Sequence, residues 1–210
     1  MADARDGRHR LAEALTRVVA REGITGVSVR AVAAEAGVSG GAVQHHFRTR
    51  AEMIRFAMEW ISDGVEHRLS RVARWGDVEE WTREILLELL PLDEQRQREH
   101  AVWLAFVAHA ATDPSLADLR NRTNEKLLEM YARIVRARRS LPPTSAVEEP
   151  VVTTMDGQVD DVDEDAMLLQ ALLDGLSLHL TEMQPDEAQR RGPALLDRFL
   201  ELVVDISTPA

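Results

Sequence analysis

A helix end at Gly37 and a helix start at Ser39, two residues apart in the sequence, constrain how the first fifty residues can fold. An apolar helical repeat runs to Glu22 and is followed by Gly23. Ser28 can cap a short second helix that ends at Gly37, a residue suited to the left-handed conformation that stops a helix. Ser39 can then cap a third helix. A helix, a three-residue turn containing glycine and a second short helix have the spacing of a helix-turn-helix.

The rest of the chain also repeats its apolar residues with helical period. Thr49 and Glu52 form a capping box that starts a long helix, about 36 Å at 1.5 Å per residue. The Gly-Pro pair at 192–193 is expected to kink the last helix or to divide it from a turn at 186–191. We expect helices from about Arg8 to Glu22, then two short ones, then 49–72, 77–90, 94–112, 113–139, 166–180 and 195–206.

These elements predict an all-α fold of about nine helices with no convincing strand system. Residues 1–48 are expected to form a helix-turn-helix head, which the long helix joins to a body at 49–210. One segment interrupts the pattern, because residues 142–165 hold three prolines, eight acids and no basic residue. We expect a long acidic loop at 142–163 that is disordered.

Charge is distributed unevenly between these two parts. The formal net charge is −11, yet residues 1–50 carry eight arginines against five acids. A basic head on an acidic body lets one end approach phosphate while the rest repels polyanions. The chain has no cysteine, no signal-peptide pattern and no apolar run of about 18 residues. We therefore expect a soluble, cytoplasmic protein.

The adjacent residues His45 and His46 suggest a metal site at first sight. Neighbours on a helix point about 100° apart, whereas chelating pairs need i,i+3 or i,i+4 spacing, and no second ligand lies at those offsets. We therefore predict no metal site. Dinucleotide and P-loop patterns are also missing, so no cofactor is predicted.

The third helix instead has the composition of a DNA reader. Gly40, Gly41, Ala42, Gln44 and His45 are its expected groove-facing residues, with Gln44 able to bond adenine and Ala42 a thymine methyl. The remaining predicted DNA contacts, mostly to phosphates, are Ser28, Arg30, Ser39, His46, Arg48, Thr49 and Arg50. The alternative is that all of these are ordinary caps and surface residues of a three-helix head.

The stretch LTRVVAREGITGVSVRAVAAEAGVSGGAVQHHFRTRAEMI resembles the DNA-binding head of TetR-type transcriptional regulators, over about residues 10–60. It departs from that pattern at Gln44, Gly40 and Arg50, where the family prefers tyrosine, lysine and lysine. VWLAFVAHAATDPSLADL and LLDGLSLHL are similar to the ligand-sensing half of the subgroup that includes the choline-responsive repressor. This resemblance implies a homodimer on a palindromic operator, released when a small molecule enters the body and tilts the long helix.

The resemblance also implies site residues in the body. Its last two helices would pair with those of a second copy. The expected dimer residues are Leu172, Gly175, Leu176, His179, Leu196, Phe199, Leu200 and Val203. The expected ligand-binding residues are Trp60, Trp81, Trp103, Phe106, His109, Met130 and Tyr131. Such walls suit an apolar or aromatic effector, although aromatic residues at helical spacing are more often plain core.

Two other classes of function remain open at this level. The first is an all-helical protein-interaction adaptor that has lost DNA binding. The second is a small all-α enzyme with His100, His109 or His179 as base, although no spacing assembles a nucleophile, a base and an orienting group. The sequence does not identify the effector, the operator or the target genes, and it does not separate repressor from activator.

Overall fold

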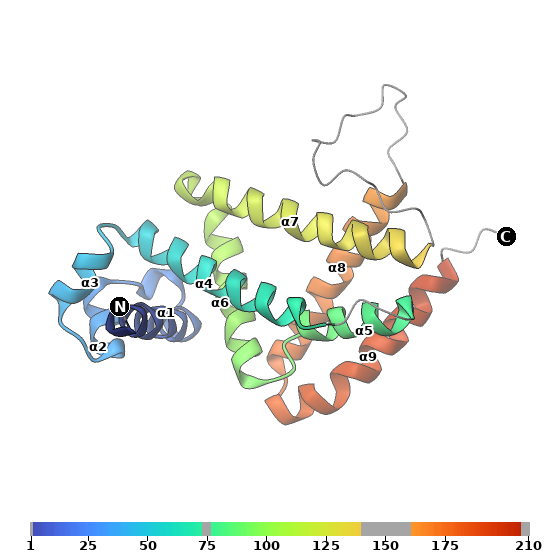
Figure 1. The fold of residues 1–210 in the computed structure, drawn as a ribbon, viewed down its shortest axis with the longest axis horizontal. Coiled ribbons are helices and arrows are strands. Elements are labelled where there is room, and N and C mark those ends of the chain that lie inside the picture. Colours follow the sequence, from blue (N-terminus) through green and yellow to red (C-terminus); the bar gives the residue numbers. More distant parts are fainter. Residues whose placement is uncertain (1, 73–76, 140–160, 207–210) are drawn as a thin grey trace, which may run out of the picture.

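The structure, a computed structural model, describes residues 2–72, 77–139 and 161–206, with side chains over 7–72, 77–139 and 162–201. Nine α-helices and a 3₁₀ turn at Ile24–Gly26 make up its regular structure, and these ranges contain no strand (Figure 1). The predicted all-α class is therefore confirmed. The helices are α1 Ala2–Glu22, α2 Val29–Ala36, α3 Gly40–His46, α4 Arg50–Ser70, α5 Val78–Leu89, α6 Glu94–Ala110, α7 Pro114–Arg138, α8 Asp161–Glu182 and α9 Pro185–Ile206.

The head forms the helix-turn-helix that its capping and helix-ending residues predict. Ser28 Oγ accepts a hydrogen bond from the Ala31 amide at 3.1 Å and so caps α2. Gly37 ends that helix in the left-handed conformation, with φ 66°. Ser39 Oγ then caps α3 from the Ala42 amide at 3.2 Å. These caps fix the angle between α2 and α3 because they satisfy backbone groups at both ends of the turn.

The long helix α4 leads from the head into the body. Thr49 Oγ1 accepts from the Glu52 amide at 3.1 Å, while Glu52 Oε2 accepts from the Arg48 amide at 2.7 Å. This is the predicted capping box, with the returning bond made one residue earlier than usual. Farther along, Arg68 Nη2 donates to Glu99 Oε2 at 2.8 Å and ties α4 to α6. The rod is therefore fixed at both ends.

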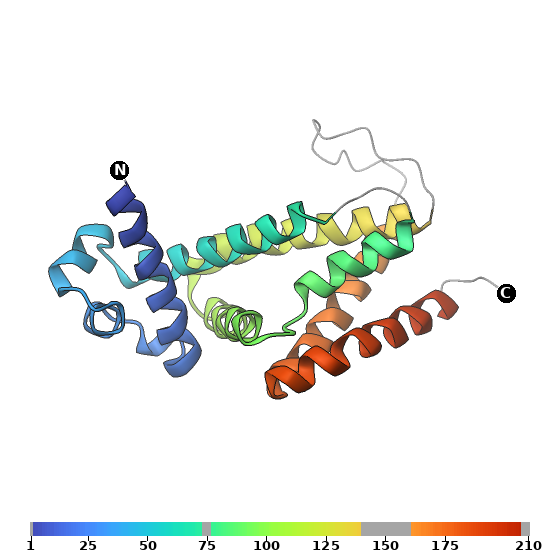
Figure 2. The same cartoon turned by 60° about the horizontal axis from the view of Figure 1, so that its bottom comes forward.

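The apolar core of the head extends beyond residue 48, where the head was expected to end. One core contains the buried residues of α1–α4 together with Val102, Phe106 and Ala110 of α6. Figure 2 looks nearly along α6, which lies between α1 and the helices of the body. A second core gathers α5, the C-terminal half of α7, α8 and α9. By its packing, α6 belongs to both the head and the body.

The last two helices differ from expectation. α9 runs as one continuous helix through Pro193, so the turn at 186–191, one of the two expectations for this segment, does not form. Its apolar face packs on α5, and Leu196 is fully buried there, which offsets the hydrogen bond that proline removes. A Cβ on Gly192 would lie 2.2 Å from Leu92 Cδ2, so a larger residue there would displace the buried Leu92 side chain.

α8 starts at Asp161, earlier than the expected resumption of helix near 166. Val162 is buried in the second core, and Asp165 pairs with Arg139 at the end of α7, so packing extends the helix beyond its clear apolar repeat. Residues 140–160 of the predicted acidic loop lie outside the described residues. None of the described helices is long and apolar enough to cross a membrane.

We expect Phe106→Ala to lower the free energy of unfolding by about 3–5 kcal/mol, because Phe106 is 0 % exposed at the junction of α6 with the head. Urea unfolding followed by circular dichroism measures this. Arg98→Ala, on the exposed side of the same helix, is the control and should change stability by less than about 0.5 kcal/mol. A loss of similar size in both variants would contradict the packing role.

Candidate nucleic-acid interface and ligand pocket

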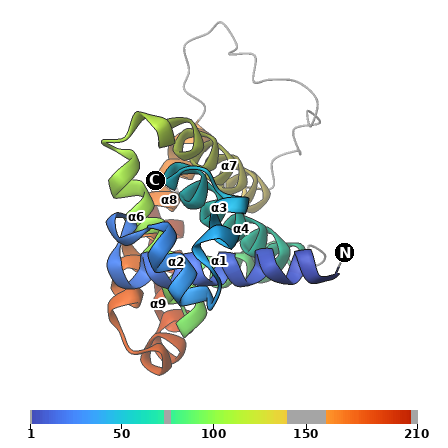
Figure 3. The same cartoon turned by 90° about the vertical axis from the view of Figure 1, so that its left-hand side faces the viewer.

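The surface of α3 is open and its inner side is anchored. Val43 is fully buried and Phe47 nearly so, which holds the helix on α1 and α2. Gly41, Ala42, Gln44, His45 and His46 are exposed, and Gly40 is half-buried. Figure 3, which views the molecule from the head, shows α1, α2 and α3 in front of the body helices. The predicted groove-facing side chains are therefore free to meet a ligand as large as a duplex.

Cationic and hydroxyl groups flank α3. Arg30 and Arg48 are exposed and have no side-chain partner among the described residues. Arg50 is exposed too, but its Nη2 donates to the carbonyl of Ile24 and so braces the loop after α1. Ser28, Ser39 and Thr49 accept backbone amides as caps, which leaves each hydroxyl proton available for a phosphate oxygen.

The acids of the head are paired on another side of it. Glu35 on α2 accepts from Arg17 at 2.7 Å and from Arg21 at 3.0 Å, and these bonds hold the pKa of the Glu35 carboxyl below its usual range. Between Val38 and Ala51 the chain has no acid at all. The arginines Arg48 and Arg50 are therefore the formally charged residues of that stretch, and Glu52 is the next acid along the chain.

The two glycines that open α3 are not required by the fold. A Cβ on Gly40 would lie 3.6 Å from Val29 Cγ1, and one on Gly41 would lie 3.8 Å from Ser39 Oγ, both ordinary contacts. Neither residue has the positive φ that favours glycine. A bare backbone at this helix start allows close approach of another surface.

The adjacent histidines show no sign of acting together. The His45 and His46 rings are 5.4 Å apart and inclined by 77°. Within the parts of the chain that the structure describes, no three His, Asp or Glu side chains are grouped as metal ligands.

The body contains a cavity of about 400 Å³ between α6, α7 and α8. Its apolar lining comes from Trp103, Leu104 and Val107 on α6. Its polar lining comes from His100, Arg120, Asn121, Asn124, Gln170 and Asp174. Gln170 Nε2 donates to Asn124 Oδ1 at 2.9 Å across the gap between α8 and α7. Asn121, Asn124 and Asp174 are exposed, so this chamber is open to solvent on one side, and its volume lies within the range of small-molecule sites.

Two groups in this chamber have shifted pKa values. Burial lowers the pKa of His100 to about 4, so its imidazole is neutral at pH 7. The Thr181 hydroxyl donates to the Ser177 carbonyl at 2.8 Å, and its Oγ1 lies 2.8 Å from His100 Nδ1. Because the Thr181 proton is already used, His100 Nδ1 must be the donor to Thr181, so the neutral ring carries its proton on Nδ1. Burial also raises the pKa of the Asp174 carboxyl.

The structure does not bring the seven predicted ligand residues together. Only Trp103 lines the chamber. Trp60 contacts the His9 ring at 4.6 Å, and Phe106 is buried against the head. His109 lies 3.4 Å from Asp113 at the end of α6. The other three belong to the second core: Trp81, Met130 and Tyr131. Burial and the nearby Asp174 charge raise the pKa of Tyr131.

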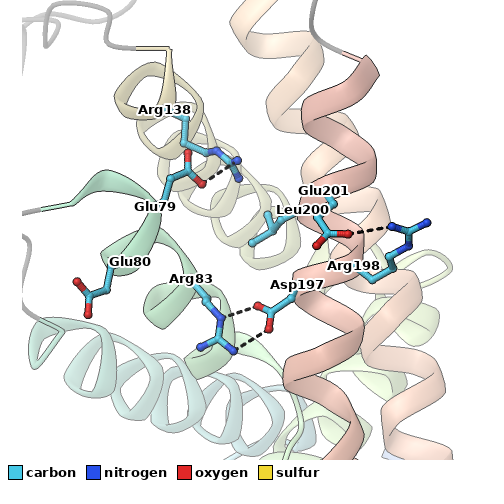
Figure 4. A pocket seen from close by; sticks show the side chains of 8 residues that line it. All are labelled: Glu79, Glu80, Arg83, Arg138, Asp197, Arg198, Leu200 and Glu201. Carbon is cyan, nitrogen blue, oxygen red and sulfur yellow. Dashed lines mark hydrogen bonds and ion pairs between the residues drawn. The ribbon is translucent and has the colours of Figure 1, made fainter.

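A larger open hollow, about 780 Å³, lies between α5, α7 and α9 (Figure 4). Its cations already have partners: Arg83 Nη2 donates to Asp197 Oδ2 at 3.0 Å, and Arg138 lies 2.9 Å from Glu79. Bonding to Asp197 raises the pKa of Arg83. These pairs link three helices, and we regard the hollow as a surface between ion pairs.

An apolar face of α8 is exposed to solvent. Met167 is 60 % exposed, Leu168 59 %, Leu172 45 % and Leu178 44 %. Gly175 lies on the same face with open space above it, and His179 is exposed beside it. The α9 residues predicted for dimerisation differ, since Leu196 and Leu200 are already buried in this chain and Phe199 is partly buried. Leu176 of α8, also predicted for the dimer, is partly buried too. The side chain of Val203 lies outside the described residues.

Comparison with known proteins agrees with this geometry. Residues 78–205 match the family model of the BetI-type transcriptional repressor C-terminal domain, and residues 11–55 match that of bacterial regulatory proteins of the tetR family. The chain belongs to the TetR family of transcriptional regulators. The enzyme alternative is thereby excluded, since the matching families and relatives are transcriptional regulators. The resemblance seen in the sequence is confirmed.

Individual relatives span most of the chain. It is 34% identical over 173 residues to the HTH-type transcriptional regulator PksA of Bacillus subtilis, covering 82% of this chain and 77% of that protein. A transcriptional regulator from Rhodococcus sp. Rha1 shares 35% identity with a TM-score of 0.70, covering 92% and 96% of the two chains. A regulator from Saccharomonospora viridis in complex with choline has a TM-score of 0.72 at 22% identity, covering 96% and 97%.

Sequence reasoning missed most of the chamber. Arg120, Asn121, Asn124 and Gln170 are ordinary polar residues on helix surfaces, and nothing in their spacing marks them. Met167, Leu168 and Leu178 were also missed as exposed apolar residues, although the strongly apolar repeat of α8 has too many large side chains for one buried face. That excess was a signal in the sequence.

Gly41→Ala tests whether α3 is shaped for an external partner. We expect thermal stability to rise, by up to about 1 kcal/mol in free energy, because alanine is the better helix former. DNA affinity, measured by fluorescence anisotropy, should fall because the added methyl holds the backbone away. Gly64→Ala in α4, where there is also space, is the control that should stabilise without weakening DNA binding. Unchanged DNA affinity in Gly41→Ala would contradict the interpretation.

Proposed function

We propose that the protein is a homodimeric, ligand-responsive repressor that binds a palindromic operator through α3 and releases it when a small molecule occupies the chamber between α6, α7 and α8. Repressor activity is supported by the BetI-type match over 78–205. The observation that carries DNA recognition is the exposed α3 surface, with the unpaired Arg30 and Arg48 beside it and no acid between Val38 and Ala51. Its site of action would be the cytoplasm.

In this proposal, Gln44 and His45 read bases from the major groove while Ala42 meets a thymine methyl. Arg30, Arg48 and the cap hydroxyls of Ser28, Ser39 and Thr49 hold phosphates on either side. Arg50 contributes to the same end of α4, and its bond to Ile24 limits how far it reaches. His46 contacts phosphate or supports the turn. The acidic body keeps the remainder of the surface away from DNA.

The homodimer is proposed to form through the exposed face of α8, with Leu172, Gly175 and His179 at its centre. Four large apolar side chains in one row are costly in water, and a second copy would cover them. Gly175 would let the two helices approach closely. Two linked heads bind two half-sites about 34–36 Å apart, which is why a palindromic operator is expected.

The chamber is proposed as the effector site, and α6 as the route to the head. Near its start α6 is tied to the end of α8, because Gln97 Nε2 donates to the carbonyls of Leu180 at 3.0 Å and Met183 at 3.1 Å. In its second half it packs on α1. The Trp103 ring, in the chamber wall, lies 5.8 Å from Phe106 in the head's core.

A ligand that moves Trp103 would therefore displace the packing of α1 through Phe106. Glu99 carries the same displacement to α4 through Arg68. The proposed mechanism thus uses both α6 and the long helix, whereas the sequence alone suggested only a tilt of the long helix. Two heads shifted in this way no longer match successive major grooves, and the ligand stabilises the released population.

Selection of bound sites from random DNA tests the reading of bases. We expect sites with half-site symmetry, and we expect Gln44→Ala to weaken binding by about 1–3 kcal/mol and relax preference at one position. Gln189→Ala, an exposed glutamine on α9, should change nothing. Binding should fall steeply with salt, because phosphate contacts release counterions. If the protein binds DNA at none of the salt concentrations tested, the adaptor alternative is favoured instead.

Sedimentation velocity tests the α8 dimer. Wild type is expected at about twice the 23.5 kDa chain mass, and Leu168→Glu at the mass of one chain, because a charge would be buried in the apolar contact. Operator affinity of this variant should fall because the two half-site contacts are no longer linked. Ala108→Glu, an exposed position on α6, should stay dimeric. A dimeric Leu168→Glu would place the contact elsewhere.

A further inference from the structure

We propose that the chamber between α6, α7 and α8 recognises a protonated amine with an apolar carbon skeleton, and that Asp174 is its counter-ion. The inference rests on the proposed function, since it names the chemical class of effector for the same site. It replaces the purely apolar or aromatic effector that the sequence suggested.

The first observation is an unpaired carboxylate. Asp174 lines the chamber and has no hydrogen bond and no ion pair among the described residues. Burial alone raises its pKa, so no cationic side chain lies near enough to offset the loss of water. The side chain is exposed at the open side of the chamber, so it can be reached by a ligand, and a ligand cation can supply the partner that it lacks in this chain.

The second observation is the fixed tautomer of His100. The His100 Nδ1–H donates to Thr181 Oγ1, and the Thr181 hydroxyl donates to the Ser177 carbonyl. Nε2 is therefore an acceptor, and it has no partner among the described residues. Asp174 and His100 thus both accept hydrogen bonds in one chamber, and they favour a ligand group that donates several. A protonated amine does so, whereas a quaternary ammonium group has no N–H.

The rest of the lining suits the carbon part of such a ligand. Trp103, Leu104 and Val107 provide an apolar wall, and an indole face also attracts cations. The chamber's other charged side chain is turned to protein groups, since Arg120 Nη1 donates to the Ala110 carbonyl at 3.4 Å and Nη2 to Asn121 Oδ1 at 3.3 Å. Asn124 and Gln170 bond each other. Asp174 is the one acid among the residues that line the chamber.

Isothermal titration of the full chain with four probes of one carbon skeleton tests the inference. The probes are 2-phenylethylamine, its trimethylammonium analogue, 2-phenylethanol and phenylacetate. The amine should bind about tenfold or more tightly than each of the others, the ratio expected when charge-assisted hydrogen bonds are lost. Tight binding of the alcohol, the trimethylammonium ion or phenylacetate, at or above the affinity of the amine, would overturn the inference.

The variants locate the effect. Asp174→Asn keeps the shape of the side chain and should bind the amine no better than the alcohol, while its melting temperature should stay close to that of wild type, because Asp174 is exposed and has no bonded partner to lose. Asp163→Asn, an exposed aspartate on the same helix, is the matched control and should keep the amine preference. An amine preference that persists in Asp174→Asn would refute the role of Asp174.

Operator release, followed by anisotropy with the same probes, separates this inference from the proposed function. If the amine binds through Asp174 and the operator stays bound, the proposed coupling fails and the inference holds. If the alcohol releases the operator equally well in wild type and in Asp174→Asn, regulation by ligand holds and the inference fails.

Discussion

The packing of α6 against the head is the interaction on which the rest of the structure depends. Val102, Phe106 and Ala110 are buried in the same apolar core as α1–α4, so the head is not an independent unit hinged at residue 49. About a third of a turn around the same helix, His100, Leu104 and Val107 line the chamber. One helix is therefore both a wall of the chamber and part of the head's core, so a displacement of α6 at the chamber also changes its packing in the head.

The parts predicted from the sequence are those that local chemistry determines. Caps and helix stops act within four residues, so Ser28, Gly37, Ser39 and Thr49 could be assigned from their neighbours alone, and the structure confirms each. Solvent-facing positions on α3 follow from the same frame once Val43 and Phe47 are placed inside.

The parts that were missed depend on contacts distant in the sequence. Pro193 suggested a break, yet packing of α9 on α5 maintains the helix, which no local pattern shows. The aromatic residues of the body looked alike as a set, but Trp60 contacts the head, Trp81 joins the second core and Trp103 alone lines the chamber. Polar chamber residues such as Asn124 and Gln170 are brought together only because α7 and α8 pack side by side (Figure 1).

Shared use of α6 also constrains how strongly the two sites can influence each other. A coupling free energy acts equally in both directions, so a ligand that weakens operator binding must itself bind more weakly when the operator is present. Trp103 contacts Phe106 within one turn, so few other contacts need to change along the route. Gln97 bonds α6 to the end of α8, and Glu99 bonds it to Arg68 of α4, so a displacement of α6 that keeps these bonds is small. Release in the proposed mechanism must therefore come from a small shift amplified by the distance between the two heads.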